Sequence, residues 1–562
     1  MLMLTLRYQN RKWINSTFAR MKKILISLLV LAACSPKLQG PNKYANDEKL
    51  IAIYEFQDQR KTDKLLPLLK AKKESHRIAA ALAFASIQDT VALPYLNQML
   101  QIDQDPMPRR AAAYALGQIG STKALGILKS AFDGELYPPN RRYILEAIGK
   151  CGDENTIQLF EENNYQDSLL QMGWAYGVFR LALRGYTSKS LNNRMIELLN
   201  DENKDLAILA SHYVYRELRN NKNIELVDSL TVAAKYHEVK ERFMLLKPLE
   251  LSNSDKAISP TFGRPWLSEF EKSNTYQKVA KINDLKSEYT SAQKFLQAII
   301  QSDSSSAILK NAAFSKYCEF YPEKKWNIII QALKSGDMAF QSLAALEIRN
   351  KTTEIESKRD EFELEVMKNL ESVKSQVKLP EQAETYIDIC KAIEALGGEK
   401  FEGYQPKYNH PIDWDYVKTI PADQQVTIKT NKGIITLQLF VEDAPGTVSN
   451  FLQLADSGFY DKKYFHRVVP QFVIQGGCPR GDGWGSLDWT QRSEFSNYQT
   501  YETGTAGIAS AGKDTEGVQF FVTHCPTPHL DGRYTIFARV VDGMDVVNKV
   551  QVGDRILKIE KK

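Results

Sequence analysis

A repeat of about 32 residues in the first third of the chain places the strongest constraint on its fold. Residues 76–88 (HRIAAALAFASIQ), 108–120 (PRRAAAYALGQIG) and 140–152 (NRRYILEAIGKCG) superpose at a spacing of 32, and a looser fourth copy follows at 176–185 (YGVFRLALRG). Each copy precedes a polar break and a second apolar stretch, such as 124–132 (ALGILKSAF). One helix pair cannot bury its own apolar face, so pairs that recur at this spacing stack on one another. The repeat therefore predicts an all-α solenoid.

Small residues recur at one phase of this repeat. Ala83, Ala115 and Ala147 occupy equivalent positions, and small side chains there let neighbouring helices approach closely. The pattern resembles HEAT-type repeats of the short bacterial variety, which implies a HEAT-like α-solenoid over residues 47–253. The periodicity is weaker in residues 254–403, where we expect degenerate repeats or a separate helical domain.

Three arginines also fall in register, and two interpretations of them remain open. Arg77, Arg109 and Arg141 could form an anion-binding ladder on a concave face. Alternatively, they could cap or solvate a helix start, or pair with a carboxylate of the adjacent repeat. The second interpretation is favoured because the repeats carry no ligand signature. We therefore expect the solenoid to bind clients or an unknown protein partner.

The first 33 residues are typical of an export signal. The apolar run 24–33 (ILISLLVLAA) follows Lys22 and Lys23 and is too short to span a bilayer. Small residues ahead of Cys34 resemble a bacterial lipobox, in which that cysteine is lipidated. A plain signal peptide and a buried strand are the alternatives. Residues 1–20 lack a pattern, so the true start is expected at Met21.

Removal of this signal changes the charge and the expected location. Residues 1–33 contain six Lys/Arg and no acid, so the formal net charge of +5 falls to about −1. No footprint for nucleic acid remains. Residues 34–46 are expected to form a flexible tether from a lipid on Cys34. Because Ser35 is not acidic, we expect a lipoprotein of the outer membrane, facing the periplasm of a bacterial cell envelope.

The number and spacing of the cysteines and histidines argue against a disulfide-stabilised fold and against a metal site. Five cysteines follow Cys34 without a CxxC pair, which is not the pattern of a disulfide scaffold. Cys478 and Cys525 could pair, and their geometry is left open. The seven histidines show no ligand spacing such as HExxH. We expect no metal and no cofactor.

The last part of the chain changes from helical to strand periodicity. Residues 404–425 hold three prolines and are expected to link the helical part to a domain at 426–562. Alternation in 426–430 and 434–440 around an Asn-Lys-Gly turn predicts a hairpin. Asp443 is a candidate N-cap for a helix that Gly458 ends. With a second helix at 544–550, the order predicts a small antiparallel barrel closed by two helices.

One stretch of this domain, 464–477 (YFHRVVPQFVIQGG), places polar side chains in an apolar strand pattern. Arg467 and Gln475 are eight residues apart, so with a period of two they share one sheet face if no bulge intervenes. An ordinary half-buried strand has little use for Arg and Gln on one face. The pattern indicates a concave site on the outside of a closed barrel.

Three segments in order resemble the signatures of one family. Residues 464–477, 504–523 (GTAGIASAGKDTEGVQFFVT) and 526–538 (PTPHLDGRYTIFA) are similar to those of the cyclophilins, a family of peptidyl-prolyl cis/trans isomerases. The resemblance covers about 426–558. It implies a closed antiparallel eight-stranded β-barrel with two capping helices. It also implies a groove on the outer face for polypeptides that contain X–Pro bonds.

The chemistry of this family is rotation about one bond. The barrier is roughly 18–20 kcal/mol because the C–N bond has partial double-bond character. A fixed guanidinium can donate to the prolyl nitrogen, whose lone pair appears only when resonance is lost. The resemblance assigns this catalytic role to Arg467, with Gln475 orienting it and Phe472 receiving the proline ring. Neighbouring His466 is expected to be a structural hydrogen-bonding residue.

The resemblance also implies the remaining substrate-binding residues. Phe521, Leu530 and Val473 complete the proline pocket, and Val473 stands where many members have methionine. His529 stands where cyclosporin-sensitive members have tryptophan, which predicts weak cyclosporin binding. The other implied contacts to substrate are Ala509, Ser510, Gln519 and Tyr534.

These observations lead to one functional hypothesis and one alternative. The chain is expected to be a multidomain, membrane-anchored peptidyl-prolyl isomerase that assists folding of exported proteins. The alternative is a non-catalytic scaffold in an envelope complex that holds a Pro-containing loop of a partner. The set Arg467, Phe472 and Gln475 favours the enzyme.

Overall fold

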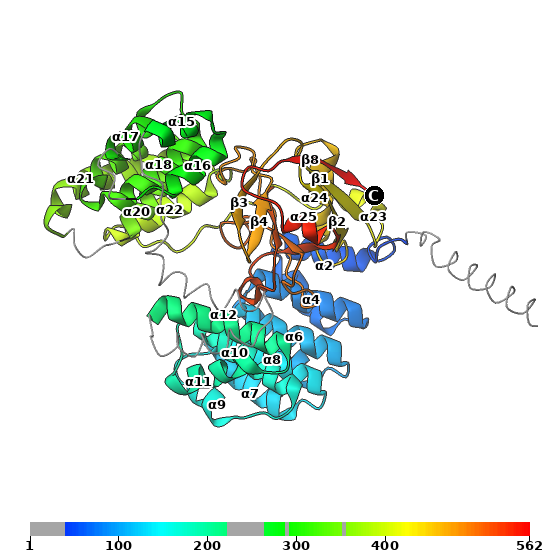
Figure 1. Ribbon diagram of the computed structural model, residues 1–562. Coiled ribbons are helices and arrows are strands. Elements are labelled where there is room, and N and C mark those ends of the chain that lie inside the picture. Colours follow the sequence, from blue (N-terminus) through cyan, green and yellow to red (C-terminus); the bar gives the residue numbers. More distant parts are fainter. Residues whose placement is uncertain (1–39, 222–263, 287–291, 351–355) are drawn as a thin grey trace, which may run out of the picture. The chain divides into compact units, whose positions relative to one another are not determined.

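The computed structural model describes residues 40–221, 264–286, 292–350 and 356–562, of which Asn42–Lys562 belong to one compact unit (Figure 1). The expected export signal and the expected lipid site, Cys34, lie outside these residues. In the described part of the chain, no helix is both long and apolar enough to cross a membrane.

The N-terminal half consists of stacked helix pairs, as predicted. The α-helices are α2 (Glu48–Asp58), α3 (Thr62–Leu65), α4 (Glu74–Ile87), α5 (Leu93–Ile102), α6 (Pro106–Ile119), α7 (Leu125–Gly134), α8 (Pro138–Cys151), α9 (Thr156–Glu162), α10 (Ser168–Leu183), α11 (Lys189–Glu197) and α12 (Lys204–Asn221). Short 3-10 helices join them: η1 (Leu66–Lys70), η2 (Thr90–Ala92), η3 (Thr122–Ala124) and η4 (Leu198–Asn200). Helices α4, α6, α8 and α10 hold the four repeat copies. We call α2–α12 the solenoid.

Small residues let these helices pack closely. Ala83 and Ala115 are fully buried and Ala147 is 2% exposed, so the predicted phase faces the core. The closest approach lies between α8 and α10, where a Cβ on Gly149 would overlap the backbone of Gly177. Only glycine fits there, which explains the Gly in this otherwise regular helix.

The register arginines bind the adjacent repeat, which confirms the favoured interpretation for two of them. Arg77 donates to Asp103 (2.7 Å) and to Asp105 (2.7 Å). Arg109 donates to Glu135 through two nitrogens (2.7 and 2.9 Å). Arg141 instead lies over the Phe132 ring, 4.3 Å from its centroid. A paired guanidinium is not available to an anion, so no anion ladder exists at Arg77 and Arg109.

A second set of helices follows the solenoid. It comprises α15 (Arg264–Lys272), α16 (Thr275–Asn283), α17 (Ala292–Gln301), α18 (Ala307–Phe320), η6 (Pro322–Lys324), α19 (Lys325–Lys334), α20 (Met338–Arg349), α21 (Glu356–Gln376) and α22 (Ala383–Ala395). These helices bury a hydrophobic core of their own, separate from the solenoid core. We call them the second helical region.

The segment expected to be a linker contains a short helix that sequence periodicity did not reveal. In α23 (Trp414–Thr419), Trp414 and Val417 belong to the hydrophobic core of the solenoid. The Trp414 ring lies 5.2 Å from the ring of Tyr44, and Asn42 donates to the Val417 carbonyl (2.7 Å). The segment is therefore packed against the solenoid at this point.

The C-terminal domain is built on one antiparallel sheet of eight strands. They are β1 (Gln425–Thr430), β2 (Gly433–Leu439), β3 (Phe465–Val469), β4 (Val473–Gly476), β5 (Thr505–Ile508), β6 (Phe520–Thr523), β7 (Ile536–Asp542) and β8 (Ile556–Lys561). Their order is β3-β4-β6-β5-β7-β2-β1-β8. Helices α24 (Pro445–Asp456) and α25 (Met544–Val547) and the 3-10 helix η8 (Pro528–Leu530) complete the domain.

The prediction of a closed barrel is wrong, because the edge strands β3 and β8 form no ladder. Their ends meet at an isolated bridge between Tyr464 and Arg555, flanked by backbone hydrogen bonds from Phe465 N to Asp554 O (2.9 Å), from Gly553 N to Phe465 O (2.9 Å) and from Ile556 N to Lys463 O (2.8 Å). The register explains this. The bridge precedes both strands, so in antiparallel alignment β3 and β8 run away from each other. The sheet is therefore a half-barrel.

Two details of the helices in this domain also differ from the sequence prediction. The N-cap of α24 is Ala444, with no side-chain cap. Asp443 instead accepts hydrogen bonds from Ser496 (3.3 Å) and Gln499 (2.9 Å), which a nearby loop offers in place of the helix N–H groups. The second helix, α25, ends at Val547, earlier than the predicted residue 550.

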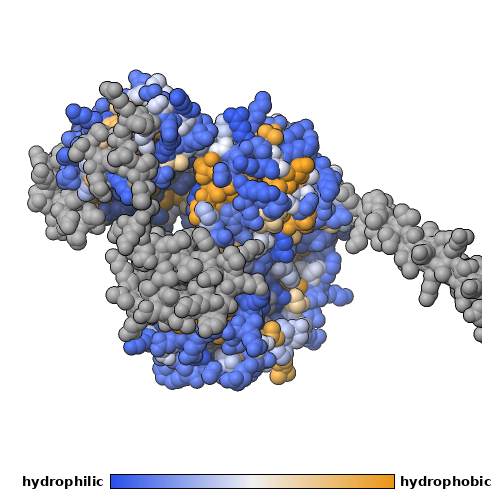
Figure 2. Space-filling model, in the orientation of Figure 1, coloured by the Kyte–Doolittle hydropathy of each residue, from blue (hydrophilic) through white to orange (hydrophobic). Residues whose placement is uncertain are grey.

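In the view of Figure 2, exposed hydrophobic residues are more frequent on the C-terminal domain than on the helical parts. Figure 2 shows them gathered over the part where β3 and β4 lie in Figure 1, while the helical surfaces in the same view are mostly hydrophilic. This apolar surface adjoins the strands that carry the candidate site.

Candidate active site

The stretch 464–477 forms a hairpin, not the single strand expected from its pattern. Strands β3 and β4 pair antiparallel, with a bulge between Phe465 and Arg467, and Arg467 lies directly opposite Gln475. The two side chains do share a face, but they do so as cross-strand partners. Direct cross-strand neighbours are within contact distance of each other, so the hairpin delivers the guanidinium and the amide to one place.

A chain of hydrogen bonds fixes these two side chains. Arg467 Nη1 donates to Gln475 Oε1 (3.3 Å), and Gln475 Nε2 donates to Gln519 Oε1 (3.1 Å). Gln519 Nε2 in turn donates to the carbonyls of Gly483 (2.9 Å) and Gly485 (3.2 Å). Each amide is oriented by the next, so Gln475 presents its oxygen to the guanidinium.

The predicted apolar residues meet beside this chain. Val473, Phe521 and Leu530 are buried and belong to one cluster, which Phe472 and Tyr534 flank. The Phe521 and Tyr534 rings lie edge to face with centroids 5.8 Å apart. The Arg467 guanidinium carbon lies 5.6 Å from the Phe472 ring centroid. An apolar pocket next to a cation is what a proline ring and its nitrogen require.

One cavity of about 740 Å³ is lined by all the predicted catalytic and substrate-binding residues. Its lining includes Arg467, Phe472, Val473, Gln475, Ala509, Ser510, Gln519, Phe521, His529, Leu530 and Tyr534. Residues from three separate sequence segments therefore form a single concave site.

Two histidines on the cavity are electrically neutral. Burial, together with the nearby Arg467 charge, lowers the pKa of His466 to about 4. Burial and the neighbouring His212 lower the pKa of His529 to about 3. The His529 ring stacks on Phe472, with centroids 5.4 Å apart and an interplanar angle of 24°. Neither ring is protonated near neutral pH, so the positive charge on the cavity wall comes from the guanidinium groups of Arg467 and Arg533.

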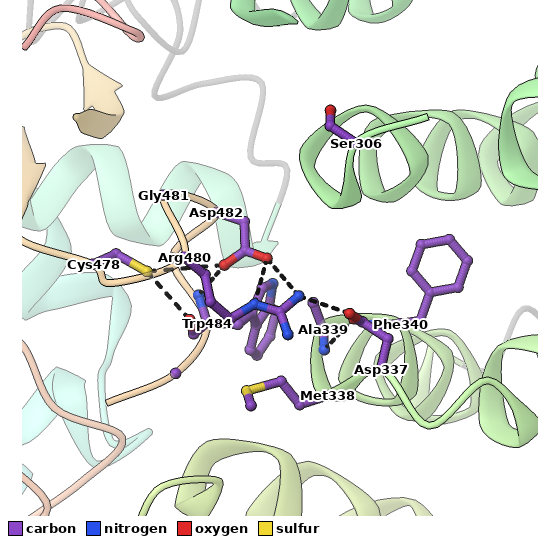
Figure 3. A network of polar contacts seen from close by, with 12 residues as sticks. Ser306, Asp337, Met338, Ala339, Phe340, Cys478, Arg480, Gly481, Asp482 and Trp484 are labelled. Carbon is purple, nitrogen blue, oxygen red and sulfur yellow. Dashed lines mark hydrogen bonds and ion pairs between the residues drawn. The ribbon is translucent and has the colours of Figure 1, made fainter. Parts of the chain in front are cut away.

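The loop after β4 forms another part of the cavity rim. Arg480 donates to Asp482 (2.9 Å) within the loop and to Asp337 (2.8 Å) at the N-terminus of α20 (Figure 3). Trp484 lines the cavity. Trp489 does not, because it stacks on His410 with ring centroids 3.9 Å apart.

The second helical region contributes lining residues that sequence reasoning missed. Pro380, Glu381, Ala383 and Glu384 reach the cavity from the start of α22. Desolvation and the nearby Asp388 raise the pKa of Glu384 to about 7. No local pattern could have revealed these residues, since the chain brings them to the site from more than eighty positions away.

The two cysteines of this domain are not bonded to each other. Both are buried, and no disulfide joins Cys478 to Cys525. Cys478 Sγ lies 3.2 Å from the Trp484 carbonyl, and Cys525 Sγ lies 2.8 Å from the Gln471 carbonyl. Among the described residues, no three His, Cys, Asp or Glu side chains come together in a way that could hold a metal ion.

Comparison with known proteins covers both halves of the chain. The family described as cyclophilin type peptidyl-prolyl cis-trans isomerase/CLD matches residues 425–560, and HEAT repeats match residues 62–149. Peptidyl-prolyl cis-trans isomerase B of Bacillus subtilis is 49% identical over 121 residues, which span 21% of this chain and 85% of that protein. The chain belongs to the cyclophilin-type peptidyl-prolyl cis-trans isomerases. It is an enzyme of this class, with HEAT repeats in its N-terminal part.

Two further relatives cover the same region. A peptidyl-prolyl cis-trans isomerase of Synechococcus elongatus is 46% identical over 138 residues, spanning 24% of this chain and 94% of that protein. A crystal structure of a Cryptosporidium parvum cyclophilin-type isomerase, in the presence of the dipeptide Ala-Pro, is 32% identical. The match covers 24% of this chain and 97% of that one, with a TM-score of 0.23.

The cyclophilin site needs only positioning and electrostatics for its reaction. As the X–Pro bond twists, the prolyl nitrogen regains a lone pair and becomes a hydrogen-bond acceptor. A guanidinium held beside the proline pocket can donate to that lone pair, an interaction that is absent in the planar ground state. Binding that exists only in the transition state raises the rate. No covalent intermediate is required.

Proposed function

We propose that this cyclophilin assists the folding of exported proteins while it is tethered to a membrane by a lipid on Cys34. The isomerase activity itself follows from family membership and from the cavity that unites Arg467, Phe472 and Gln475. The proposal about location rests on the apolar run 24–33 and the small residues before Cys34. A second part of the proposal concerns the solenoid, which brings client proteins to the isomerase.

Labelling and fractionation test the anchor. Cells expressing the full chain are labelled with a palmitate analogue, beside a Cys34→Ala variant. The proposal expects label and outer-membrane fractionation for the natural chain only. If the natural chain carries no label and is found in the soluble fraction, the proposed lipid anchor is wrong, while the isomerase assignment is unaffected.

Exposed apolar side chains on the solenoid support client binding. Leu136 is 92% exposed and Ile102 is 66% exposed, and both lie at the ends of repeat helices or in the loops between them. Exposed apolar residues on neighbouring repeats suit an unfolded, apolar client.

A double variant, Ile102→Asp with Leu136→Asp, separates client binding from chemistry. We expect slower refolding of an unfolded proline-limited protein, while isomerisation of a short X–Pro peptide is unchanged. Equal activity of the variant on both substrates would contradict client binding at this surface. The peptide assay is the internal control, since neither Ile102 nor Leu136 lines the isomerase cavity.

A further inference from the structure

One wall of the cyclophilin cavity is held by the solenoid. We call residues 526–534 the substrate loop, because it includes η8 and carries the cavity residues His529, Leu530 and Tyr534. Three side chains from three solenoid helices bind its backbone. Gln118 of α6 donates to the Gly532 carbonyl (2.7 Å) and Arg180 of α10 to the Pro528 carbonyl (2.6 Å). His212 of α12 lies 2.8 Å from the Pro526 carbonyl.

Arg180 makes the most extensive of these contacts. Its side chain is 4% exposed and also bridges Asp531 of the loop (3.3 Å) and Glu146 of α8 (2.9 Å). Burial opposes the charge on Glu146, but Lys150 and Arg180 hold its pKa to about 2. Glu146 is therefore ionised and keeps the guanidinium in place. A planar fork can bind a carboxylate on one side and a carbonyl on the other at fixed angles, which an ammonium group cannot do.

The loop passes this constraint to the proline pocket. Asp531 Oδ1 also accepts from Tyr501 N (2.8 Å), and the Tyr501 ring stacks on Phe521 with centroids 5.5 Å apart. On the other side, the His529 ring lies between Phe472 and His212, 5.4 and 5.8 Å from their centroids. A row of three rings thus runs from the pocket into solenoid helix α12.

We propose that the solenoid is part of the substrate site, and that Arg180 is a positioning residue that holds the substrate loop against the proline ring. Arg180 touches no substrate atom; it acts through Pro528, His529 and Leu530. The contacts that these residues offer to proline are the same in the planar and twisted states. Loss of Arg180 therefore weakens binding of both states equally, which raises KM and leaves kcat unchanged.

The test uses the purified full chain with an X–Pro peptide, and exchange NMR over a range of peptide concentrations gives kcat and KM separately. Removing one partner of a buried charged contact weakens binding by about tenfold or more. For Arg180→Ala we expect KM to rise by about that factor, with kcat within about threefold. Arg180→Lys keeps the positive charge but not the planar guanidinium, so its KM is expected to lie between those of the natural chain and Arg180→Ala.

Arg77→Ala is the matched control. Arg77 is also a solenoid arginine bound to carboxylates and backbone carbonyls, with a side chain that is 13% exposed, but none of its hydrogen bonds goes to the substrate loop. Arg77→Ala should destabilise the solenoid and leave KM within about twofold of the natural value, since the Arg77 side chain makes no hydrogen bond to a residue that lines the cavity. A KM for Arg180→Ala that equals that of Arg77→Ala, in folded samples, would overturn the proposal.

Two further variants decide the question if Arg180→Ala does not fold. Asp531→Asn keeps an oxygen for Tyr501 N and removes only the charge that faces Arg180. His212→Ala removes one ring of the row and the contact to Pro526. Both should raise KM, and unchanged KM in both would refute a role of the solenoid in the site. The inference rests on the isomerase assignment, and the two can fail separately. If the unsubstituted chain does not isomerise the peptide, the isomerase assignment is wrong. If it does, but the variants leave KM unchanged, only the inference about the solenoid is wrong.

Discussion

The substitution Arg467→Ala measures how much of the catalysis comes from one guanidinium. The side chain donates to Gln475 and lies 5.6 Å from the Phe472 ring centroid. The two nearby histidines are neutral, because burial holds the pKa of His466 to about 4 and that of His529 to about 3. Loss of one preorganised donor to a developing charge costs about 10²–10³ in kcat, or roughly 2.7–4 kcal/mol. We expect a loss of this size with KM little changed.

Gln475→Ala sharpens the same prediction. Gln475 contacts Arg467 through one hydrogen bond of 3.3 Å, so it orients the guanidinium and does not replace it. One hydrogen bond to a charged group is worth about 1.5–3 kcal/mol, which gives a loss of about 10- to 150-fold. In the double variant the loss should equal that of Arg467→Ala alone, because a residue that acts through another has nothing left to orient.

Exchange NMR on an X–Pro peptide, with circular dichroism to confirm folding, provides the assay. Two results would refute the reasoning. One is an Arg467→Ala variant that retains most of its kcat. The other is a Gln475→Ala effect that adds in full to that of Arg467→Ala, since full additivity means that the two side chains act independently.

Three further predictions concern stability and thiol chemistry. Burial raises the pKa of Glu516 from its ordinary 4.5 to about 8. The folded state therefore binds this proton more tightly than the unfolded state, and the free energy of unfolding falls as the pH rises through this window. Glu516→Gln should lose less stability than the natural chain between pH 5 and 8, and an equal fall in melting temperature for both proteins would contradict this. Gly149→Ala should lower the free energy of unfolding by about 1–3 kcal/mol or more, because the new Cβ would overlap the Gly177 backbone. Gly126→Ala is the control, since its Cβ would have no atom within 4 Å, and it should raise the free energy of unfolding by up to about 1 kcal/mol. Urea titrations measure both. Reductant should leave the melting temperature unchanged, and Cys478 should react with alkylating reagents only upon unfolding, because it is free and buried and burial raises its pKa.

Local sequence patterns predicted the elements well where the determining contacts are local, and the resemblance to the cyclophilins supplied the site residues. The repeat phase placed Ala83, Ala115 and Ala147 in the solenoid core because small side chains at one phase let each repeat pack against the next. Arg467 and Gln475 were correctly placed on one face, but for a different reason, since the turn that makes them a hairpin is not visible in an apolar strand pattern. The Asp443 cap failed because a loop fifty residues away offered competing donors.

Long-range packing is what the sequence could not predict. The helix at Trp414 forms because its indole completes the solenoid core with Tyr44, a contact without a local signature. The same holds for Glu384, which reaches the cavity from the second helical region. Closure of the barrel depended on where β3 and β8 begin relative to one bridge, and a shift of a few residues in either strand decides it.

The contacts between the solenoid and the substrate loop also set an order of events during synthesis. Pro526 and Pro528 bind side chains that precede them by 314 and 348 positions. Domains generally fold as units, N-terminal first, while the ribosome is still translating. The helices that carry Arg180 and His212 are thus complete before the loop leaves the ribosome. The nascent C-terminal domain meets a preformed template, and its active site matures only when the last tenth of the polypeptide has been made.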